Sequence, residues 1–112
     1  LHLSIRRQRQ MCIRDSTGGG FCGNIPRILP ESVDVEIDTS AWTPLPIFKL
    51  IEQAGRIDFD EMYEVFNMGM GMTLCVDASM AGTILKECHA HGCRAVAIGS
   101  AVNGSGKVRL MR

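Results

Sequence analysis

The segment Val33–Asp38 alternates strictly between apolar and acidic side chains. This period of two is typical of a β-strand that buries one face and exposes the other. It is the clearest strand signal in the chain, and it predicts a sheet with one buried face. The length of 112 residues suffices for one small globular domain built around such a sheet.

Helical and strand patterns continue along the chain. Thr43 is the expected N-cap of a helix with Pro44 at its first position, and Asp58 with Glu61 resembles a capping box that opens another helix. Gly92 stands where a helix often ends in a left-handed residue. The expected elements, in order, are a short helix within 21–29, the strand at 33–37, helices at 44–55 and from 58 to about 66, a buried strand at 70–76, a helix at 78–91, and strands around 96–98 and 108–110 with a turn at Asn103 and Gly104 between them.

The charges balance overall but not along the chain. Twelve Lys and Arg stand against twelve Asp and Glu, so the formal net charge is zero. Four of the arginines and none of the acids fall in residues 1–14, which leaves eight basic and twelve acidic residues in the remainder. Affinity for a phosphate backbone depends on clustered Lys and Arg. The composition therefore argues against a nucleic-acid partner.

The lengths of the apolar runs and the number of cysteines indicate in which cellular compartment the chain is expected. No run approaches the roughly 20 apolar residues of a membrane span, so we expect no membrane partner. The cysteines are odd in number and no leader-like apolar core precedes them. This usage favours a reduced, cytoplasmic chain. The five are Cys12, Cys22, Cys75, Cys88 and Cys93.

Residues 1–14 stand apart from the rest of the sequence. They carry no cap, no turn signal and no sustained period, so we interpret them as a non-native leader fused to a truncated gene. A targeting or nucleic-acid-binding arm is the alternative. The expected division is a leader at 1–14 and a partial domain at 15–112.

Three consecutive glycines follow Thr17 and need a reason, because each glycine costs conformational entropy on folding. Backbone N–H groups in such a loop form a concave array that suits a phosphate. Asn24 and Arg27 lie one helical turn apart, so an amide and a guanidinium could face the same anion. The alternative is a plain tight turn with both side chains in solvent. The candidate phosphate-binding residues are Thr17, Gly18, Gly19, Gly20, Asn24 and Arg27.

A second glycine motif links an expected helix to an expected buried strand. Asn67, Gly69 and Gly71 lie at this junction, where a backbone can closely approach a ligand or another chain. We predict a loop that lines a cleft. The alternative is an Asn helix cap followed by a glycine bend.

Two further motifs are not expected to carry chemistry. Cys88, His89, His91 and Cys93 are ligand types for zinc, but Cys88 belongs to the apolar face of its helix and His89 points about a hundred degrees away. We therefore expect no metal site there. The Gly-Ser-Gly-Lys stretch at 104–107 lacks the spacing of a P-loop. The pattern contains no Ser-His-Asp order or paired carboxylates, so the catalytic residues stay unknown.

The two glycine motifs and the segments around them match a known family in order. The matching segments are Thr17-Gly18-Gly19-Gly20, Asn24-Ile25-Pro26-Arg27-Ile28-Leu29-Pro30, Glu36-Ile37-Asp38, the helix at 42–55, Glu61-Met62, Phe66-Asn67-x-Gly69-x-Gly71-Met72 and Ala97-Ile98-Gly99. From residue 17 to about residue 110 the chain resembles the phosphoribosylformylglycinamidine cyclo-ligase family, also called AIR synthetase or PurM. The resemblance implies an α+β fold in which helices cover a mixed β-sheet, like the C-terminal domain of that family in truncated form.

The resemblance also implies an enzyme of purine biosynthesis. The family uses ATP, with Mg²⁺, to close the imidazole ring of aminoimidazole ribotide from formylglycinamidine ribotide, and its members are cytoplasmic homodimers. The partner is thus a small-molecule substrate. By the same resemblance, the glycine triplet, Asn24 and Arg27 would hold the phosphoribosyl end of this substrate near a cleft between domains.

Two departures from the family limit what the chain is expected to do. Asp15-Ser16 stands where the family has His-Ile. The ATP-binding, dimer-forming domain and the Ser-Gly-x-His-Ser-Asn-Gly segment of the family are not in this sequence, so we expect the chain alone to be inactive. The alternatives are another enzyme of the superfamily, similar to thiamine-monophosphate kinase or to a hydrogenase maturation factor, and a non-enzymatic zinc or protein-interaction module. The Asn24 to Arg27 motif with the adjoining Pro30 argues against the first.

Overall fold

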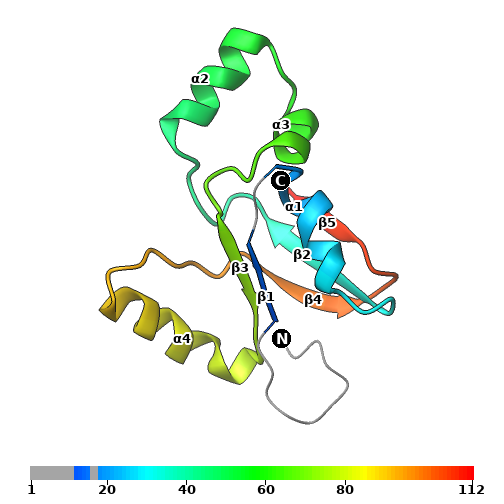
Figure 1. Ribbon diagram of the computed structural model, residues 1–112, viewed down its shortest axis with the longest axis vertical. Coiled ribbons are helices and arrows are strands. Elements are labelled where there is room, and N and C mark those ends of the chain that lie inside the picture. The colour runs from blue at the N-terminus through cyan, green and yellow to red at the C-terminus, as the bar shows by residue number, and fades with distance from the viewer. Residues whose placement is uncertain (1–11, 16–17) are drawn as a thin grey trace.

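Two β-sheets organise the chain in the computed structural model, which describes residues 12–15 and 18–112 (Figure 1). The larger sheet has the order β4 (Gly99–Asn103), β2 (Val33–Asp38), β5 (Val108–Met111). β2 is antiparallel to β4 and parallel to β5, so the sheet is mixed as expected. The smaller sheet pairs β1 (Cys12–Asp15) antiparallel with β3 (Met72–Cys75). The strictly alternating segment is thus the centre of the larger sheet.

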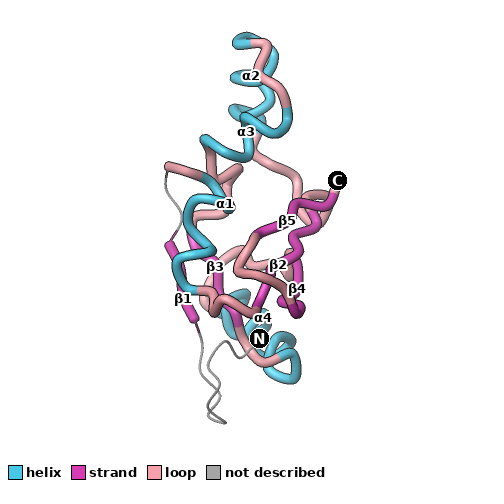
Figure 2. The backbone as a smooth tube through the Cα atoms, turned by 90° about the vertical axis from the view of Figure 1, so that its right-hand side faces the viewer, coloured by secondary structure: helices cyan, strands magenta, loops and turns pink. Residues whose placement is uncertain are grey.

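Helices lie at both ends of the molecule. α1 (Gly20–Asn24) continues directly as the 3-10 helix η1 (Ile25–Ile28) and packs against α3 (Phe59–Val65). α2 (Pro46–Gly55) and α3 form one end, and α4 (Ala78–Ala90) lies at the other (Figures 1 and 2). In the described part of the chain, no helix has the length and apolar character needed to cross a bilayer. The overall architecture is an α+β fold.

The core lies between α1, α3 and one face of β2. The ring of Phe21 meets Trp42 edge to face, with 5.7 Å between ring centroids, and stacks on Tyr63 at 6.2 Å. Such aromatic pairs contribute roughly 0.5–1.5 kcal/mol beyond the burial of their area. The buried apolar cluster comprises Phe21, Ile25, Val35, Ile37, Met62, Tyr63 and Met68. α1 is therefore anchored by its aromatic side chain despite its short length.

Local sequence signals predict several elements correctly. β2 and β5 occupy the expected positions. The N-cap of α3 is confirmed, because the side chain of Asp58 accepts the N–H of Glu61 at 2.9 Å, which is one of the two bonds of a capping box. α4 also ends as expected, and Gly92 follows it with a φ of 76°.

The helix expected from Pro44 begins two residues later. α2 starts at Pro46, and Leu45 before it is extended, with φ −58° and ψ 147°. The residue that precedes a proline is disfavoured in the helical region, so Leu45 interrupts any helix that would start at Pro44. Thr43 is consequently not the N-cap, and the sequence prediction is wrong at this end of the helix.

The strand expected around residues 96–98 is wrong in position, because β4 begins at Gly99. A Cβ at this residue would collide with the carbonyl oxygen of Glu36 in β2, so glycine lets the two backbones pair here. Ile98 stays outside the strand, and its carbonyl accepts the N–H of Asp38 at 2.7 Å. Apolar spacing could not signal a pairing that depends on a missing side chain.

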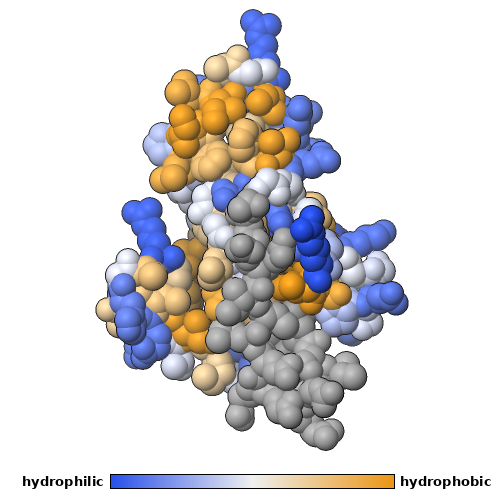
Figure 3. All heavy atoms as spheres, in the orientation of Figure 1, coloured by the Kyte–Doolittle hydropathy of each residue, from blue (hydrophilic) through white to orange (hydrophobic). Residues whose placement is uncertain are grey.

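The strand expected to be buried at 70–76 is shorter and more exposed than predicted. β3 has four residues, and two of them, Met72 and Leu74, are 59% and 37% exposed. Only its last residue, Cys75, is buried. Within the described ranges β3 pairs with β1 alone, and α4 beside it has no buried residue. Apolar side chains also gather at the surface over α2 and around α4 (Figure 3).

Asp34 in β2 holds the connection between β4 and β5. The residue is buried, and Oδ1 accepts the backbone N–H groups of Lys107 at 2.8 Å and Ser105 at 2.7 Å. Hydrogen bonds to an ionised carboxylate favour that form, and these two bonds hold the pKa of Asp34 below its usual value. Nη2 of Arg109, 3.5 Å from Oδ2, acts in the same direction.

Asp34→Asn is expected to lower the melting temperature near neutral pH. Because the pKa of Asp34 is lowered in the folded state, its stabilising contribution is present above the ordinary carboxyl value and is lost as the pH falls through the folded value. The difference in melting temperature between Asp34→Asn and the parent should therefore become smaller as the pH drops below about 4. Thermal melts followed by circular dichroism across this pH range measure it.

Asp60→Asn is the matched control for this prediction. The carboxylate of Asp60 is exposed and bonds Arg112 at 2.7 Å, and exposed pairs contribute only about 0–1 kcal/mol. The melting temperature of this variant should stay close to that of the parent. If the melting temperatures of Asp34→Asn and the parent differed by the same amount at every pH, the stabilising role of the ionised Asp34 carboxylate would be contradicted.

Candidate functional site

The first glycine motif packs its backbone against the C-terminal end of α3. Gly19 and Gly20 have positive φ values of 94° and 59°. The N–H of Gly19 donates to the carbonyl of Val65 at 3.3 Å, and a Cβ on Gly20 would collide with the carbonyl oxygen of Tyr63. The close approach of two backbones is therefore a sufficient reason for glycine at position 20, whereas the positive φ is the reason at Gly19, where a Cβ would meet no atom closer than 3.7 Å.

Asn24 holds this glycine loop in shape. Its side chain is 3% exposed, and Nδ2 donates to the carbonyls of Gly18 at 3.1 Å and Gly20 at 2.7 Å. An amide nitrogen has two N–H groups, and both are directed at the backbone of the loop. The amide of Asn24 thus holds the backbone of the loop, and a direct contact between this amide and an anion stays a prediction.

Arg27 and Gly18 form the solvent-facing part of the motif. Arg27 lies in η1 and is exposed, and it makes no ion pair or hydrogen bond with another residue of the range 18–112. Gly18 is also exposed, with open space where a side chain would be. Thr17, the first residue of the predicted set, lies outside the described residues. The guanidinium of Arg27 is therefore accessible to an anion arriving from solvent.

The second glycine motif is a turn closed by Asn67. Oδ1 of Asn67 accepts the N–H of Gly69 at 2.9 Å, and Met68 and Gly69 have φ values of 52° and 93°. Nε1 of Trp42 donates to the carbonyl of Met68 at 3.1 Å. Gly71 is exposed, with nothing within contact distance of a Cβ built there. The turn is thus held by an asparagine from within and by a tryptophan from outside.

The structure brings the two glycine motifs together. Gly20 lies against the carbonyls of Tyr63 and Phe66, and Asn67 follows Phe66 directly. Both loops therefore flank the C-terminal end of α3 (Figures 1 and 2). The sequence predicts each loop separately but not their proximity. The glycine triplet is the sequence feature that points to this proximity, because glycine is favoured where another part of the structure approaches the backbone closely.

The electrostatics of the first motif favour one of its two sides for an anion. The carbonyls that end α3 are the negative end of its dipole. Burial, and after it the charge of Glu64 in α3, raises the pKa of the Cys22 thiol above its usual value. An anion is therefore disfavoured on the side of the loop that faces α3. Arg27, in η1 a few residues after the loop, is an exposed cation.

The histidines of the 88–93 cluster lie against backbone carbonyls. Nε2 of His89 is 3.0 Å from the carbonyl of Ala95, and Nδ1 of His91 is 2.9 Å from that of Glu87. A carbonyl only accepts hydrogen bonds, so each of these nitrogens carries the proton, and the other nitrogen of each ring is the one left to ligate a metal. No three or more metal-ligating side chains come together within 18–112. That the cluster binds no metal stays a prediction.

The described residues do not fit a site for ATP and Mg²⁺. In the 104–107 stretch, the N–H groups of Ser105 and Lys107 already bind the carboxylate of Asp34, so they are not presented to a phosphate. Mg²⁺ prefers carboxylate and phosphate oxygens in octahedral geometry. Within 18–112, no cluster of three acidic, histidine or cysteine side chains is placed to hold it.

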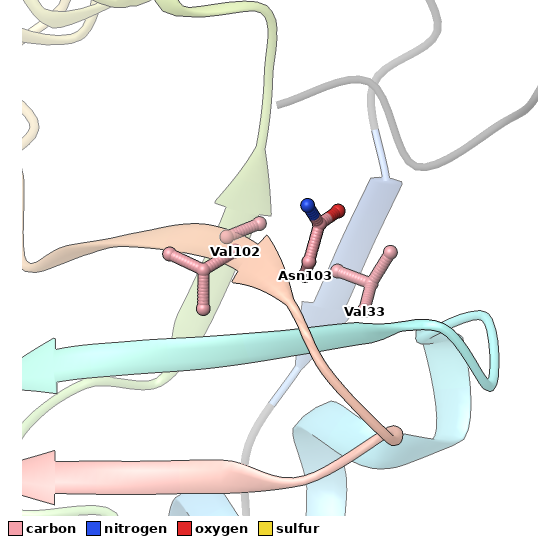
Figure 4. Close-up of a pocket in the computed structure, with 4 residues that line it drawn as sticks. Val33, Val102 and Asn103 are labelled. Atoms are coloured by element: carbon pink, nitrogen blue, oxygen red, sulfur yellow. The ribbon is translucent and has the colours of Figure 1, made fainter.

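An open hollow of about 410 Å³ lies over β2 and β4 (Figure 4). Its lining residues are Val33, Ala101, Val102 and Asn103. Val33 and Asn103 are register partners on the two strands. The lining contains no charged side chain and none of the predicted site residues, so the hollow is separate from the two glycine motifs.

Comparison with known proteins agrees with the resemblance read from the glycine motifs. The family model described as "AIR synthase related protein, C-terminal domain" matches residues 3–111. The chain belongs to this family. The expected recognition and the expected α+β fold are thereby confirmed.

Curated relatives of this AIR synthase related chain are named phosphoribosylformylglycinamidine cyclo-ligase. The protein of Bacillus cytotoxicus is 44% identical over 90 residues, which are 80% of this chain and 26% of the relative. That of Alkaliphilus metalliredigens is 45% identical over 94 residues, 84% of this chain and 27% of the relative. That of Bifidobacterium longum is 50% identical over 70 residues, 62% of this chain and 20% of the relative. The chain thus spans about a quarter of the length of the first two relatives.

Gly20→Ala is expected to destabilise this AIR synthase related domain. A non-glycine residue in the left-handed region costs about 1–2 kcal/mol, and here the added methyl group must also displace the end of α3. Gly18→Ala, at an exposed position with open space around it, is the matched control and should change stability by less than about 1 kcal/mol. Urea unfolding followed by fluorescence measures both. Equal effects of the two substitutions would contradict the close approach at Gly20.

Proposed function

We propose that the chain is the C-terminal part of a phosphoribosylformylglycinamidine cyclo-ligase. This enzyme closes the imidazole ring of aminoimidazole ribotide from formylglycinamidine ribotide in purine biosynthesis. The observation that carries the proposal is the 44% identity, over 80% of the chain, to a relative of that name. The two glycine motifs that meet at the end of α3 support it, because they are the segments on which the family resemblance rests.

A different enzyme of the superfamily is the less well supported candidate. The three relatives described above come from different bacterial genera and carry the same cyclo-ligase name. A thiamine-monophosphate kinase or a hydrogenase maturation factor would not account for that agreement. A zinc module is also less well supported, since no three or more His, Cys, Asp or Glu side chains come together as a ligand set within 18–112.

The cofactors and the assembly belong to the longer enzyme in this proposal. ATP and Mg²⁺ would bind to a part of the enzyme other than residues 18–112, because the described donors do not fit them. The longer enzyme would be a cytoplasmic homodimer that acts on a small phosphorylated substrate, without a nucleic-acid or membrane partner. The overall charge of zero agrees with an anion site that is local rather than spread over the surface.

The first glycine motif is the proposed binding site for the phosphate of that substrate. Arg27 supplies the charge, and Thr17 and Gly18 to Gly20 supply the surrounding backbone. Asn24 supports the site indirectly, since its amide holds the carbonyls of Gly18 and Gly20 turned away from the anion. The second motif, with Asn67, Gly69 and Gly71, would line the adjoining cleft.

Arg27→Ala is expected to weaken binding of formylglycinamidine ribotide in a full-length enzyme that carries this segment. A charge-assisted bond to phosphate contributes on the order of 1.5–3 kcal/mol, which corresponds to roughly a 10- to 100-fold increase in Kd. Isothermal titration calorimetry with the ribotide measures this change.

Arg94→Ala is the control for the Arg27 experiment. Arg94 is exposed like Arg27 but follows α4, the helix at the other end of the molecule from α2 (Figure 1). Its replacement should leave the Kd unchanged, and Arg27→Lys should lose less affinity than Arg27→Ala because it keeps the charge. Unchanged affinity in Arg27→Ala would refute the phosphate site.

The 112-residue chain alone is expected to lack cyclo-ligase activity. The reaction requires ATP and the ribotide to be held in line, and losing one binding site removes this positioning altogether. A coupled assay for ADP release in the presence of formylglycinamidine ribotide measures the activity, with the full-length relative from Bacillus cytotoxicus as the positive control. The exposed Leu50 and Met72, at 60% and 59%, should also make the chain bind an apolar dye. Turnover by the chain alone would contradict this prediction.

A further inference from the structure

α4 ends in a hydrogen-bond pattern that places two cysteines at paired positions. After the helix the chain turns through Gly92, whose φ is 76°. The N–H of Gly92 donates to the carbonyl of His89 at 3.0 Å, and the N–H of Cys93 donates to the carbonyl of Cys88 at 2.8 Å. These two bonds define a Schellman motif, in which Cys88 is the third residue before the helix cap and Cys93 is the second residue after it.

The Schellman motif brings these two positions close together. They frequently carry apolar side chains that touch each other, whereas here both are cysteine. The path between the two Cα atoms runs along the Cα–N bond of Cys93, the hydrogen bond, and the C=O and Cα–C bonds of Cys88. With 2.8 Å for the hydrogen bond and about 1.2–1.5 Å for each covalent bond, the two Cα atoms lie at most about 7 Å apart, and less because the path is bent. A disulfide requires a separation of about 4.4–6.8 Å.

Both thiols are reduced and differ in exposure. Cys93 is exposed, whereas Cys88 is half-buried at the end of the helix. In the described range 18–112, the two histidines and the two thiols do not come together as a set of three or more metal ligands. The pair therefore consists of one cysteine that an oxidant can reach and a second whose backbone is hydrogen-bonded to it.

We propose that Cys88 and Cys93 form an oxidisable dithiol that closes a disulfide at the C-terminal end of α4. The oxidant is a small hydroperoxide. The sulfur of Cys93, having lost its proton, attacks one oxygen of hydrogen peroxide, the O–O bond breaks, and water leaves, so that a sulfenic acid forms. The sulfur of Cys88 then attacks the sulfur of Cys93, and a second water leaves with the thiol proton of Cys88. In total, two thiols and one peroxide give one disulfide and two waters.

The disulfide restrains how α4 is joined to the larger sheet. Residues 94–98 connect Cys93 to Gly99, which pairs with Ile37 at the centre of that sheet. Fixing Cys93 to the last turn of α4 shortens the free part of this connection. This modification site does not depend on which reaction the longer enzyme catalyses.

The sequence around the pair allows a direct test. Trypsin cleaves after Lys86 and Arg94, so residues 87–94 are released as one peptide that contains Cys88 and Cys93 and no other cysteine. The native chain is treated with a small excess of hydrogen peroxide, alkylated, digested and analysed by mass spectrometry. The peptide is expected to become two hydrogen masses lighter and resistant to alkylation. Dithiothreitol should reverse both changes.

Two comparisons separate a preformed pair from chance closure of a short loop. Closure should be several-fold slower in urea and in Gly92→Val, because both remove the left-handed turn that aligns the two cysteines. Gly82→Ala, at an exposed position within α4 with open space around it, is the control and should close at the parent rate. A peptide that stays alkylatable in the native chain, or closes as fast in urea or in Gly92→Val, would overturn the proposal.

Discussion

The backbone contact between the glycine loop and the carbonyl end of α3 is the constraint on which the candidate site depends. It exists only because Gly20 has no side chain, and it directs the loop carbonyls toward the amide of Asn24. The same contact places Phe21, the next residue, between Trp42 and Tyr63. Site geometry and core packing are therefore coupled. A change that separates the two backbones would disturb both at once.

Elements with local signals can be predicted from the sequence, whereas those that depend on distant neighbours cannot. β2 follows from its alternation, and the start of α3 follows from Asp58 and Glu61, three residues apart. The start of β4 depends on a close approach between Gly99 and Glu36, 63 positions earlier in the chain. The exposure of β3 depends on which segments cover it. No pattern within β3 itself reports that.

Asp34 illustrates how a correct pattern can still misplace a residue. The alternation assigns it to the polar face of β2, which it occupies, but the turn at 104–107 folds over that face and buries the carboxylate. In the candidate site, the same limit applies to Asn24. Its spacing from Arg27 is visible in the sequence, but the inward direction of its amide is not. The boundary at residue 15 stays a prediction, although β1 covers 12–15 and the family match begins at residue 3.

The hydrogen bond from Trp42 to the second glycine loop makes this residue an intrinsic optical reporter. Trp42 is the single tryptophan of the chain. Its indole N–H contacts the carbonyl of Met68, and its ring packs on Phe21, which follows the first glycine loop. The emission of an indole depends on its hydrogen bonding and on nearby rings. A rearrangement of either loop would therefore change the emission spectrum without any added label.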